Sequence, residues 1–357
     1  MNIKTKKLLR HLCMFSGLIL TGNMAHAACS VSASGTSSIS VPSIYLMENG
    51  ENSSQFNSGL SCTGFSLALA NMTYLKYRVE QMSNSFTNAQ TGEKLNAIIL
   101  DSNNEIISLG QEKDMSSFTL VNLFSGPDGN LPFYIRLPAG QSVSPGVYRA
   151  DSPLKVKWFY SVPAVAIVGI GAFFESPGFK RGVLGIGFNW GSGADSLGSL
   201  SITVLPDCRI LAQDVNFGTA AFASKLEPVQ SSMGIRCWVN TPYYVSLNNG
   251  LSPQNGNQRA MKSQTGNTFL KYDIFKNSSN DRWGSGNERW SSLNATINPG
   301  VHNGVTQQNY VFTTKIVDEN ADTIPAGTYS QTTLLFIQDS KKTRNNSSTE
   351  SINHSLR

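Results

Sequence analysis

The chain has 357 residues, and charged residues make up 14% of it, well below the roughly 25% of an average soluble domain. Lys and Arg number 28 against 23 Asp and Glu, but four of the basic residues, Lys4, Lys6, Lys7 and Arg10, lie within the first ten positions. The rest of the chain is therefore almost neutral. This balance argues against a nucleic-acid partner and against a polybasic membrane patch.

Residues 1–27 are predicted to be a secretory signal peptide. The basic residues precede an apolar stretch, Leu12–Leu20, and the small residues Ala25 and Ala27 surround a cleavage point. We therefore expect an exported protein whose mature chain begins at Ala28. A mature length of about 330 residues fits two domains better than one.

Four cysteines remain once Cys13 is removed with the signal peptide, and in an oxidising compartment an even number favours disulfides. Counting alone allows three pairings. The spacing between Cys29 and Cys62 is close to that between Cys208 and Cys237, which favours one bridge in each domain. The alternative, a lipid anchor on Cys29, would leave Cys62 single.

The mature sequence is typical of antiparallel β-sheets. Apolar and polar residues alternate over Tyr243–Leu247, and Asn249-Gly250 then supplies a turn that tolerates positive φ. No stretch shows convincing helical periodicity, and turn residues are frequent. We therefore predict an all-β fold of two Ig-like antiparallel β-sandwiches in tandem.

Landmarks repeated in the same order indicate that the two domains are copies of one another. Similar runs, Leu95–Leu100 and Leu270–Phe275, each begin 33 residues after the second cysteine of their copy. Later, Pro145–Tyr148 corresponds to Pro325–Tyr329. We place an N-terminal domain at residues 28–205, a C-terminal domain at 206–337 and a polar, disordered tail at 338–357.

The second copy carries a set of short motifs that together resemble a known module. They are Cys208, Phe217-Gly218, Cys237, Tyr243–Gly250, Arg259–Met261, Leu270–Phe275, Trp283-Gly284 and Pro325–Tyr329. This set resembles the spore coat protein U domain, the pilin module of archaic chaperone-usher pili. The two-domain layout is similar to the tip adhesins of Csu-type pili. One departure is Gln331, where the family usually has an acidic residue.

The resemblance implies how the protein is made and assembled. Its partners would be a periplasmic pilus chaperone, an outer-membrane usher and an adjacent pilin subunit, and it would travel through the periplasm to the pilus tip on the cell surface. In this family an incomplete C-terminal sandwich is completed by a donor strand from the neighbouring subunit, a form of β-strand addition. No cofactor is implied.

The two copies differ on the C-terminal side of the shared tyrosine. After Tyr148 the first copy continues through a strand at Leu154–Trp158 and another at Leu197–Leu205, whereas the second has only Thr332–Ile337 and the tail. We therefore expect an open acceptor groove, bordered by Leu334, Leu335, Phe336 and Ile337. The alternative is that this run is the last strand of a complete sheet.

The position in the fibre is predicted from the other end of the mature chain. A subunit that fills its neighbour's groove needs a strand-length extension before the first cysteine, but only Ala28 precedes Cys29 after the predicted cleavage. A subunit that can accept but not donate a strand belongs at the tip.

An apolar insertion between the last two strands of the first copy is the predicted surface-binding loop, which would attach cells to abiotic or host surfaces in biofilms. Its residues are Val162, Pro163, Val165, Ile167, Val168, Ile170, Phe173 and Phe174, and a second apolar run, Gly182–Phe188, comes after it. Strand direction places the insertion at the end of the domain away from the linker. Exposed apolar patches mark interaction sites, but the same pattern also fits buried core strands.

Other functions receive less support from the sequence. Trp158, Tyr160 and Trp190 could form a platform for sugar rings in a lectin-like tip adhesin, although aromatic residues also anchor cores. The chain could instead be a structural coat or scaffold protein of the cell surface. No catalytic, phosphate-binding or zinc motif is present, so we expect neither an enzyme nor a metal site. The acidic run Asp318–Asp322 lacks the pattern of a calcium loop and is interpreted as a solvated turn.

Overall fold

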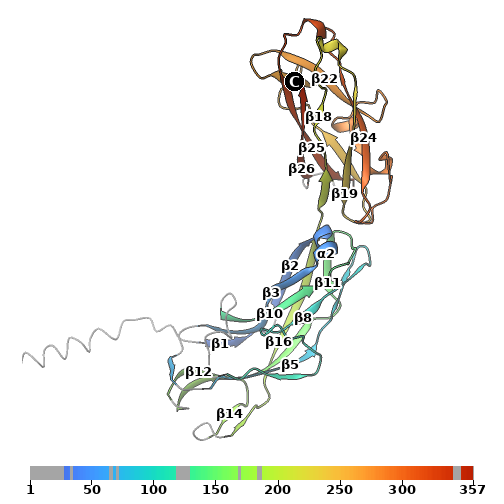
Figure 1. The fold of residues 1–357 in the computed structure, drawn as a ribbon. Helices are drawn as coiled ribbons and strands as arrows, with labels where there is room; N and C mark the ends of the chain where they lie inside the picture. The colour runs from blue at the N-terminus through green and yellow to red at the C-terminus, as the bar shows by residue number, and fades with distance from the viewer. Residues whose placement is uncertain are drawn as a thin grey trace, which may run out of the picture.

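The computed structural model describes residues 28–32, 35–63, 67–69, 72–117, 129–167, 170–182, 187–340 and 347–356. The predicted signal peptide lies outside these residues. The described chain forms two β-sandwich domains, the first blue to green and the second yellow to red in Figure 1. The last strand of the first domain ends at Leu205 and the first strand of the second begins at Cys208, so only Pro206 and Asp207 join them.

The elements of the first domain, in chain order, are β1 Ala28–Val31, β2 Gly35–Pro42, α2 Ser43–Asn49, β3 Glu51–Thr63, β4 Leu67–Leu69, β5 Tyr74–Gln81, β6 Ser85–Asn88, β7 Lys94–Asn96, β8 Ile98–Leu100, β9 Glu112–Asp114, β10 Asn130–Leu137, β11 Gly146–Ala150, β12 Leu154–Ile167, β13 Ile170–Glu175, β14 Lys180–Arg181, β15 Phe188–Asn189 and β16 Ala194–Leu205. The smaller sheet has the order β1-β3-β10-β8. The larger has the order β7-β6-β11-β16-β12-β5-β9, with β2, β4 and β13 paired beside it.

Aromatic rings fill the space between the two sheets of the first domain. The ring of Phe133, on the smaller sheet, has its centroid 5.4 Å from that of Tyr77 and 5.7 Å from that of Trp158, both on the larger sheet. All three side chains are buried. The inward faces of the strands therefore supply one continuous core, as expected of a sandwich.

The elements of the second domain are β17 Cys208–Leu211, β18 Val215–Asn216, β19 Val229–Cys237, β20 Tyr243–Leu247, β21 Ala260–Ser263, β22 Phe269–Lys276, β23 Trp290–Ser291, β24 Gln308–Ile316, β25 Tyr329–Asp339 and β26 Ser347–Leu356, with short 3-10 turns at Ala223–Lys225, Gly286–Glu288, Ser292–Asn294 and Ala321–Thr323. One layer is β17-β19-β24-β22, and the other contains β21, β25, β20 and β23 with β18 and β26. β22 joins the layers, because residues 269–271 pair with β21 and residues 272–276 pair with β24. Trp283 lies in this core, and its indole N–H donates to the carbonyl of Val245 at 3.0 Å.

One disulfide closes a loop in each domain, as predicted. Cys29 bonds to Cys62 between β1 and β3, and Cys208 bonds to Cys237 between β17 and β19. In both cases the two residues lie directly opposite each other in an antiparallel ladder. Each bridge stabilises its domain by about 3–4 kcal/mol if it acts mainly by restricting the unfolded chain.

A tyrosine corner is repeated in the two domains. The hydroxyl of Tyr148, at the start of β11, donates to the carbonyl of Ser144 at 2.7 Å, and that of Tyr329, at the start of β25, donates to the carbonyl of Pro325 at 2.7 Å. The same bond, to the residue four positions earlier, is a hallmark of Ig-type sandwiches. These tyrosines are the pair matched in sequence, which supports the duplication.

The completing strands occupy equivalent positions in the two domains. β16 is antiparallel to β11 and parallel to β2, whereas β26 is antiparallel to β25 and parallel to β18. We expected residues 338–357 to be disordered, but Gln338 and Asp339 end β25 and Ser347–Leu356 forms β26. Backbone pairing explains the difference, because an open sheet edge can hydrogen-bond a polar segment as well as an apolar one.

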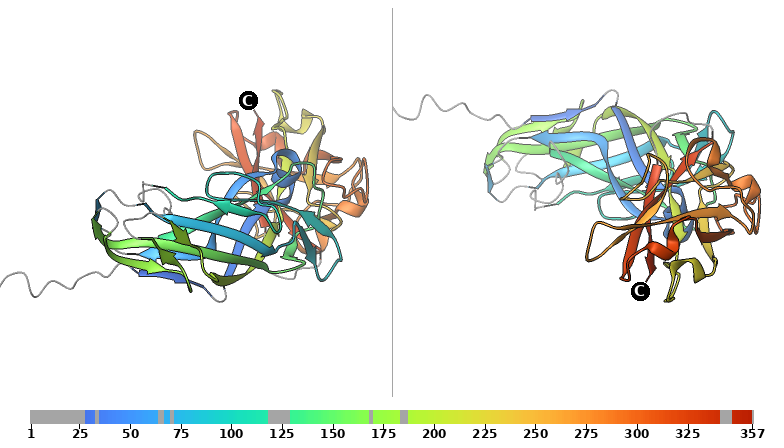
Figure 2. Two further views of the ribbon diagram at one scale, coloured as in Figure 1. Left: turned by 90° about the horizontal axis from the view of Figure 1, so that it is seen from below. Right: turned by 90° about the horizontal axis from the view of Figure 1, so that it is seen from above.

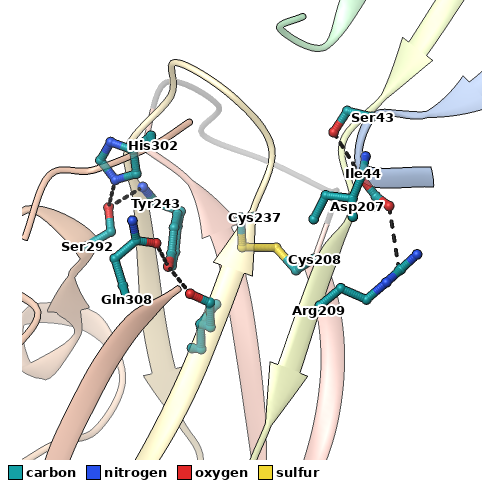
Figure 3. The surroundings of a disulfide bond; sticks show 11 residues. Ser43, Ile44, Asp207, Cys208, Arg209, Cys237, Tyr243, Ser292, His302 and Gln308 are labelled. Carbon is teal, nitrogen blue, oxygen red and sulfur yellow. Dashed lines mark hydrogen bonds and ion pairs between the residues drawn. A yellow bond between two sulfur atoms is a disulfide. The ribbon is translucent and has the colours of Figure 1, made fainter. Parts of the chain in front are cut away.

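The short linker is held by the first domain. The carboxylate of Asp207 accepts hydrogen bonds from the hydroxyl of Ser43 at 2.9 Å and from the amide of Ile44 at 2.8 Å (Figure 3). These residues begin α2, which has no side-chain cap of its own. A carboxylate is favourable at a helix N-terminus, so the linker supplies the missing cap.

Candidate functional sites at the two ends of the molecule

The β12–β13 hairpin lies at the distal end of the first domain, away from the second. The first part of β12 pairs antiparallel with β16, from Leu154 with Gly198 to Trp158 with Ala194. Because β16 runs toward the linker, β12 runs away from it and extends beyond the start of β16. Its last part pairs with β13, and Figures 1 and 2 show this green hairpin far from the red and orange domain.

The structure divides the predicted surface-binding loop into buried and exposed positions. Val162 is 2% exposed and Pro163 is also buried, so these two belong to the core rather than to a displayed surface. Ile170 is 69% exposed, and Phe173 and Phe174 are half-buried. Val165 and Ile167 lie within β12, where the structure describes their backbone only, and Val168 lies outside the described residues.

An aromatic cluster lies beside this hairpin, and only two of its members, Phe188 and Trp190, are site candidates on sequence alone. The Tyr74 ring is 4.5 Å from that of Phe188 and 5.8 Å from that of Phe179, and Trp190 is 5.0 Å from Phe188. Tyr74 and Phe179 are buried, Trp190 is half-buried, and Phe188 is 44% exposed. The cluster therefore has a packed base and an exposed edge.

Arg181 connects the cluster to the strands around it. Its guanidinium donates to the hydroxyl of Ser161 at 2.8 Å and to the carbonyls of Met72 and Ser161 at 3.0 Å each. It also lies 3.8 Å from the centre of the Phe173 ring and 3.7 Å from a Glu175 oxygen. Burial lowers the pKa of this guanidinium, while the charge of Glu175 opposes that shift.

A turn at residues 177–179 brings Phe179 and Arg181 to this site. Phe179 donates its amide to the carbonyl of Ser176 at 3.1 Å, and Gly178 has a φ of +76°, which glycine adopts without strain. The sequence Pro177-Gly178-Phe179-Lys180-Arg181 signals this turn, but its charges suggest a solvated loop. No local sequence pattern indicates that the Arg181 guanidinium bonds to Ser161 of β12, or that the Phe179 ring packs against Tyr74 of β5.

Two of the three residues of the predicted sugar platform are buried in the structure. Trp158 is fully buried, and its indole N–H donates to the hydroxyl of Ser196 at 2.9 Å. Tyr160 is 6% exposed. Only Trp190 is half-exposed, and the Lys76 ammonium lies 4.8 Å from the centre of its ring. The three aromatic residues therefore do not present a joint stacking surface.

The second candidate site is the strand β25 and its backbone edges. Leu335 and Ile337 face the core and are at most 1% exposed, whereas Leu334 and Phe336 are half-buried on the other face. One backbone edge of this strand pairs with β20 and β21 and the other with β26. The four residues predicted to border an acceptor groove therefore lie where β26 is added, and the run is not the last strand of the sheet.

Three charged groups that line the main cleft of the second domain pair with one another. A cleft of about 850 Å³ in the second domain is lined by Asp273, Arg282 and Glu288, but Arg282 pairs with both carboxylates. Asp318 accepts from the amides of Lys271 and Asn320, which fits a structural turn. The described residues contain no group of acidic, His or Cys side chains that could hold a metal ion.

Among the helices of the described chain, none has the length and apolar character needed to cross a membrane.

The tandem sandwiches, the bridge in each and the strand added beside β25 together define the class of the protein. They are the features of chaperone-usher pilus subunits, whose members join by β-strand addition.

Comparisons with known proteins agree with this class. The family model described as Spore Coat Protein U domain matches residues 195–335. Among solved structures, the chain is 85% identical, with a TM-score of 0.69, to one from the CsuC-CsuE chaperone-tip adhesion subunit pre-assembly complex of the archaic chaperone-usher Csu pili of Acinetobacter baumannii. That match covers 91% of this chain and 100% of the other.

Two further solved structures are much less similar. They are the adhesive subunit CfaE of CFA/I fimbria of enterotoxigenic Escherichia coli (10% identity, TM-score 0.31, 92% and 99% of the two chains covered) and the CupB6 tip adhesin from Pseudomonas aeruginosa (10%, 0.28, 94% and 98%). Comparison with curated protein sequences finds no match.

The chain belongs to the family of archaic chaperone-usher pilus subunits, and within it to the tip adhesion subunits. Members of this family reach the cell surface through the periplasm as parts of pili. The relatives found are adhesive and structural subunits, not enzymes.

Proposed function

We propose that this chain is a pilus tip adhesin that attaches cells to surfaces, and so promotes biofilm formation, through the apolar side chains at its distal end. By analogy with the chaperone-tip adhesion subunit complex of Acinetobacter baumannii, a periplasmic chaperone binds it before assembly. An outer-membrane usher then joins it to an adjacent pilin subunit, which donates a strand to the groove beside β25.

The exposure of Ile170 at the far end of the molecule is the observation that carries this proposal. It is the most exposed large apolar side chain among the described residues, at 69%, and it lies at the start of β13 in the distal hairpin. Phe188, on the edge of the neighbouring aromatic cluster, is also exposed. Such side chains would be buried on contact with an apolar surface, which is favourable in proportion to the area removed from water.

The test is adhesion of cells whose pili carry Ile170→Ser or Phe188→Ser. Binding to polystyrene should fall for each variant and further for the double variant. Leu251→Ser is the matched control, because Leu251 is 68% exposed but lies in the second domain, away from the distal end. Equal numbers of pili on all strains, checked by immunoblot, separate adhesion from assembly.

Adhesion at the wild-type level in the double variant would overturn the proposal. A glycan array distinguishes the lectin-like alternative: binding to one sugar, unaffected by the two serine substitutions, would favour it. Cells that retain normal adhesion when the whole first domain is deleted would favour a purely structural coat or scaffold role.

A further inference from the structure

β26 closes the groove of the second domain with the chain's own C-terminal segment. It pairs with β25 in an unbroken antiparallel register, from Tyr329 with Leu356 to Gln338 with Ser347. On its other edge it pairs in parallel with β18, through Val215 with His354 and Asn216 with Ser355. Both borders of the groove are therefore hydrogen-bonded to one segment.

The first domain has a strand, β16, in the position equivalent to that of β26. There β16 lies between β11 and β2 with the same two orientations, antiparallel and parallel. Ile202 of β16 pairs with the corner residue Tyr148, just as Leu356 of β26 pairs with the corner residue Tyr329. β26 thus stands in the position of the strand that completes an Ig-type sandwich.

We infer that residues 347–356 are an intramolecular plug of the acceptor groove. In the free subunit the segment pairs with the open edge of β25 and covers the core at Val215, Leu335 and Ile337, which are all fully buried. A donor strand from another subunit must then displace the plug. The plug itself rests on the fold alone, and only the displacement step rests on the proposed function.

The composition of the plug suits a strand that a donor strand can displace from the groove. The residues in register with the five core-facing positions of β25 are Ser348, Glu350, Ile352, His354 and Leu356. Only two of these are apolar. By contrast, β16 contributes three buried apolar side chains, Leu200, Ile202 and Val204, to the first domain.

The low apolar content of the plug favours its replacement by a donor strand. Backbone hydrogen bonds are available to any strand in the groove, so occupants differ mainly in the apolar surface that they bury. A donor with apolar residues at all inward positions is stabilised more than the plug. The plug therefore protects the edge from aggregation without preventing assembly.

Cross-linking tests the register in the full chain. Leu334→Cys combined with Ser351→Cys places two thiols directly opposite each other, as in both natural disulfides. This variant, purified without chaperone, should be a monomer with no free thiol. Leu334→Cys with Ser347→Cys is the control, because Ser347 pairs with Gln338, four residues out of register, and it should keep two free thiols. Free thiols in both variants, or cross-linked dimers, would overturn the intramolecular plug.

Truncation tests the contribution to folding. A chain ending at Asp339 should lose the calorimetric transition of the second domain and keep that of the first, and a synthetic peptide of residues 347–356 should restore the lost transition. Identical transitions in the truncated and full chains would contradict the plug. Neither the loss of the transition nor its recovery with the peptide involves adhesion. A negative result would therefore contradict the plug without contradicting the proposed function.

Displacement is tested in cells that assemble the pilus. The oxidised Leu334→Cys/Ser351→Cys variant should be missing from purified pili, because its groove cannot open, whereas the out-of-register control should be incorporated. Incorporation of both variants at the same level would overturn the exchange step.

Discussion

One guanidinium, that of Arg181, holds several strands of the distal end together. It satisfies the carbonyls of Met72 and Ser161 and lies over the Phe173 ring. Removing it leaves partly buried acceptors without donors, which costs about 1–3 kcal/mol. Arg181→Gln should lower the free energy of unfolding of the first domain by that amount and speed amide exchange in β12 and β13. Lys180→Gln, at an exposed neighbour, should change neither quantity.

His302 makes the second domain sensitive to acid. Its Nε2 lies 2.8 Å from the hydroxyl of Ser292, which also accepts from the amide of Tyr243 (Figure 3). Burial lowers the pKa of His302 below its usual value of about 6.5. The unfolded chain therefore takes up the proton first, and stability falls as the pH drops from about 6.5 through the lower folded pKa.

His302→Gln should remove this part of the pH dependence. The measurement is the urea midpoint of the second domain between about pH 7 and about pH 5. His354 is present in both proteins, so the difference between their pH profiles isolates His302. Parallel profiles would show that His302 takes up its proton equally in both states.

The tyrosine corners offer a matched test of the duplicated strands β11 and β25. Tyr329→Phe loses the hydrogen bonds to the Pro325 carbonyl and the Thr268 hydroxyl, and it should destabilise only the second domain, by about 1–2 kcal/mol. Tyr148→Phe should destabilise only the first, and by more, because the second partner of the Tyr148 hydroxyl is a Glu93 carboxylate oxygen at 3.0 Å, and hydrogen bonds to charged groups are stronger than neutral ones. Calorimetry that resolves two transitions measures both, and a shift of the wrong transition would contradict independent folding of the domains.

Strands with a clear period could be predicted from sequence, and strands defined by their partner could not. Alternation identified Tyr243–Leu247, which is β20, and paired landmarks located the corners and the disulfides. β26 was missed because Ile352 and Leu356 are its only aliphatic residues. Its backbone is ordered by the open edge of β25, and that edge leaves no pattern in the tail itself.

The distal site shows the same limit. Val162 and Ile170 belong to one apolar run, but one is buried between neighbouring strands and the other is exposed. An apolar run is compatible with either environment, since burial depends on which strands lie alongside. Phe179 and Arg181 belong to a turn with charged residues, so their part in the aromatic cluster depends on the fold rather than on local sequence.

Contacts across the linker set the relative orientation of the two domains. Glu48, in the last turn of α2, pairs with Arg236 and lies 3.8 Å from Arg209, both in the second domain. At the other end of α2, Asp207 binds the hydroxyl of Ser43 and the amide of Ile44. The helix is therefore joined to the linker near its first residue and to the second domain near its last.

Removing these contacts should loosen the junction without unfolding either domain. Glu48→Ala with Asp207→Ala should broaden the distribution of distances between one spin label on each domain, measured by double electron–electron resonance. The transition of the second domain should shift little, because exposed ion pairs contribute only about 0–1 kcal/mol each. The first domain should still fold but lose about 0.5–2 kcal/mol, because Asp207 caps α2. Glu319→Ala, at an exposed site away from the junction, is the control. An unchanged distribution would show that other contacts fix the orientation.

The position of the Cys208–Cys237 bridge has a mechanical consequence. A pull on the distal hairpin while the second domain is held passes along β16, through Pro206 and Asp207, and enters the second domain at Cys208. The first residue to bear the load there is covalently tied to β19. Tension therefore cannot peel β17 from its neighbour starting at the linker, and in flowing liquid the force passes directly into the body of the sandwich.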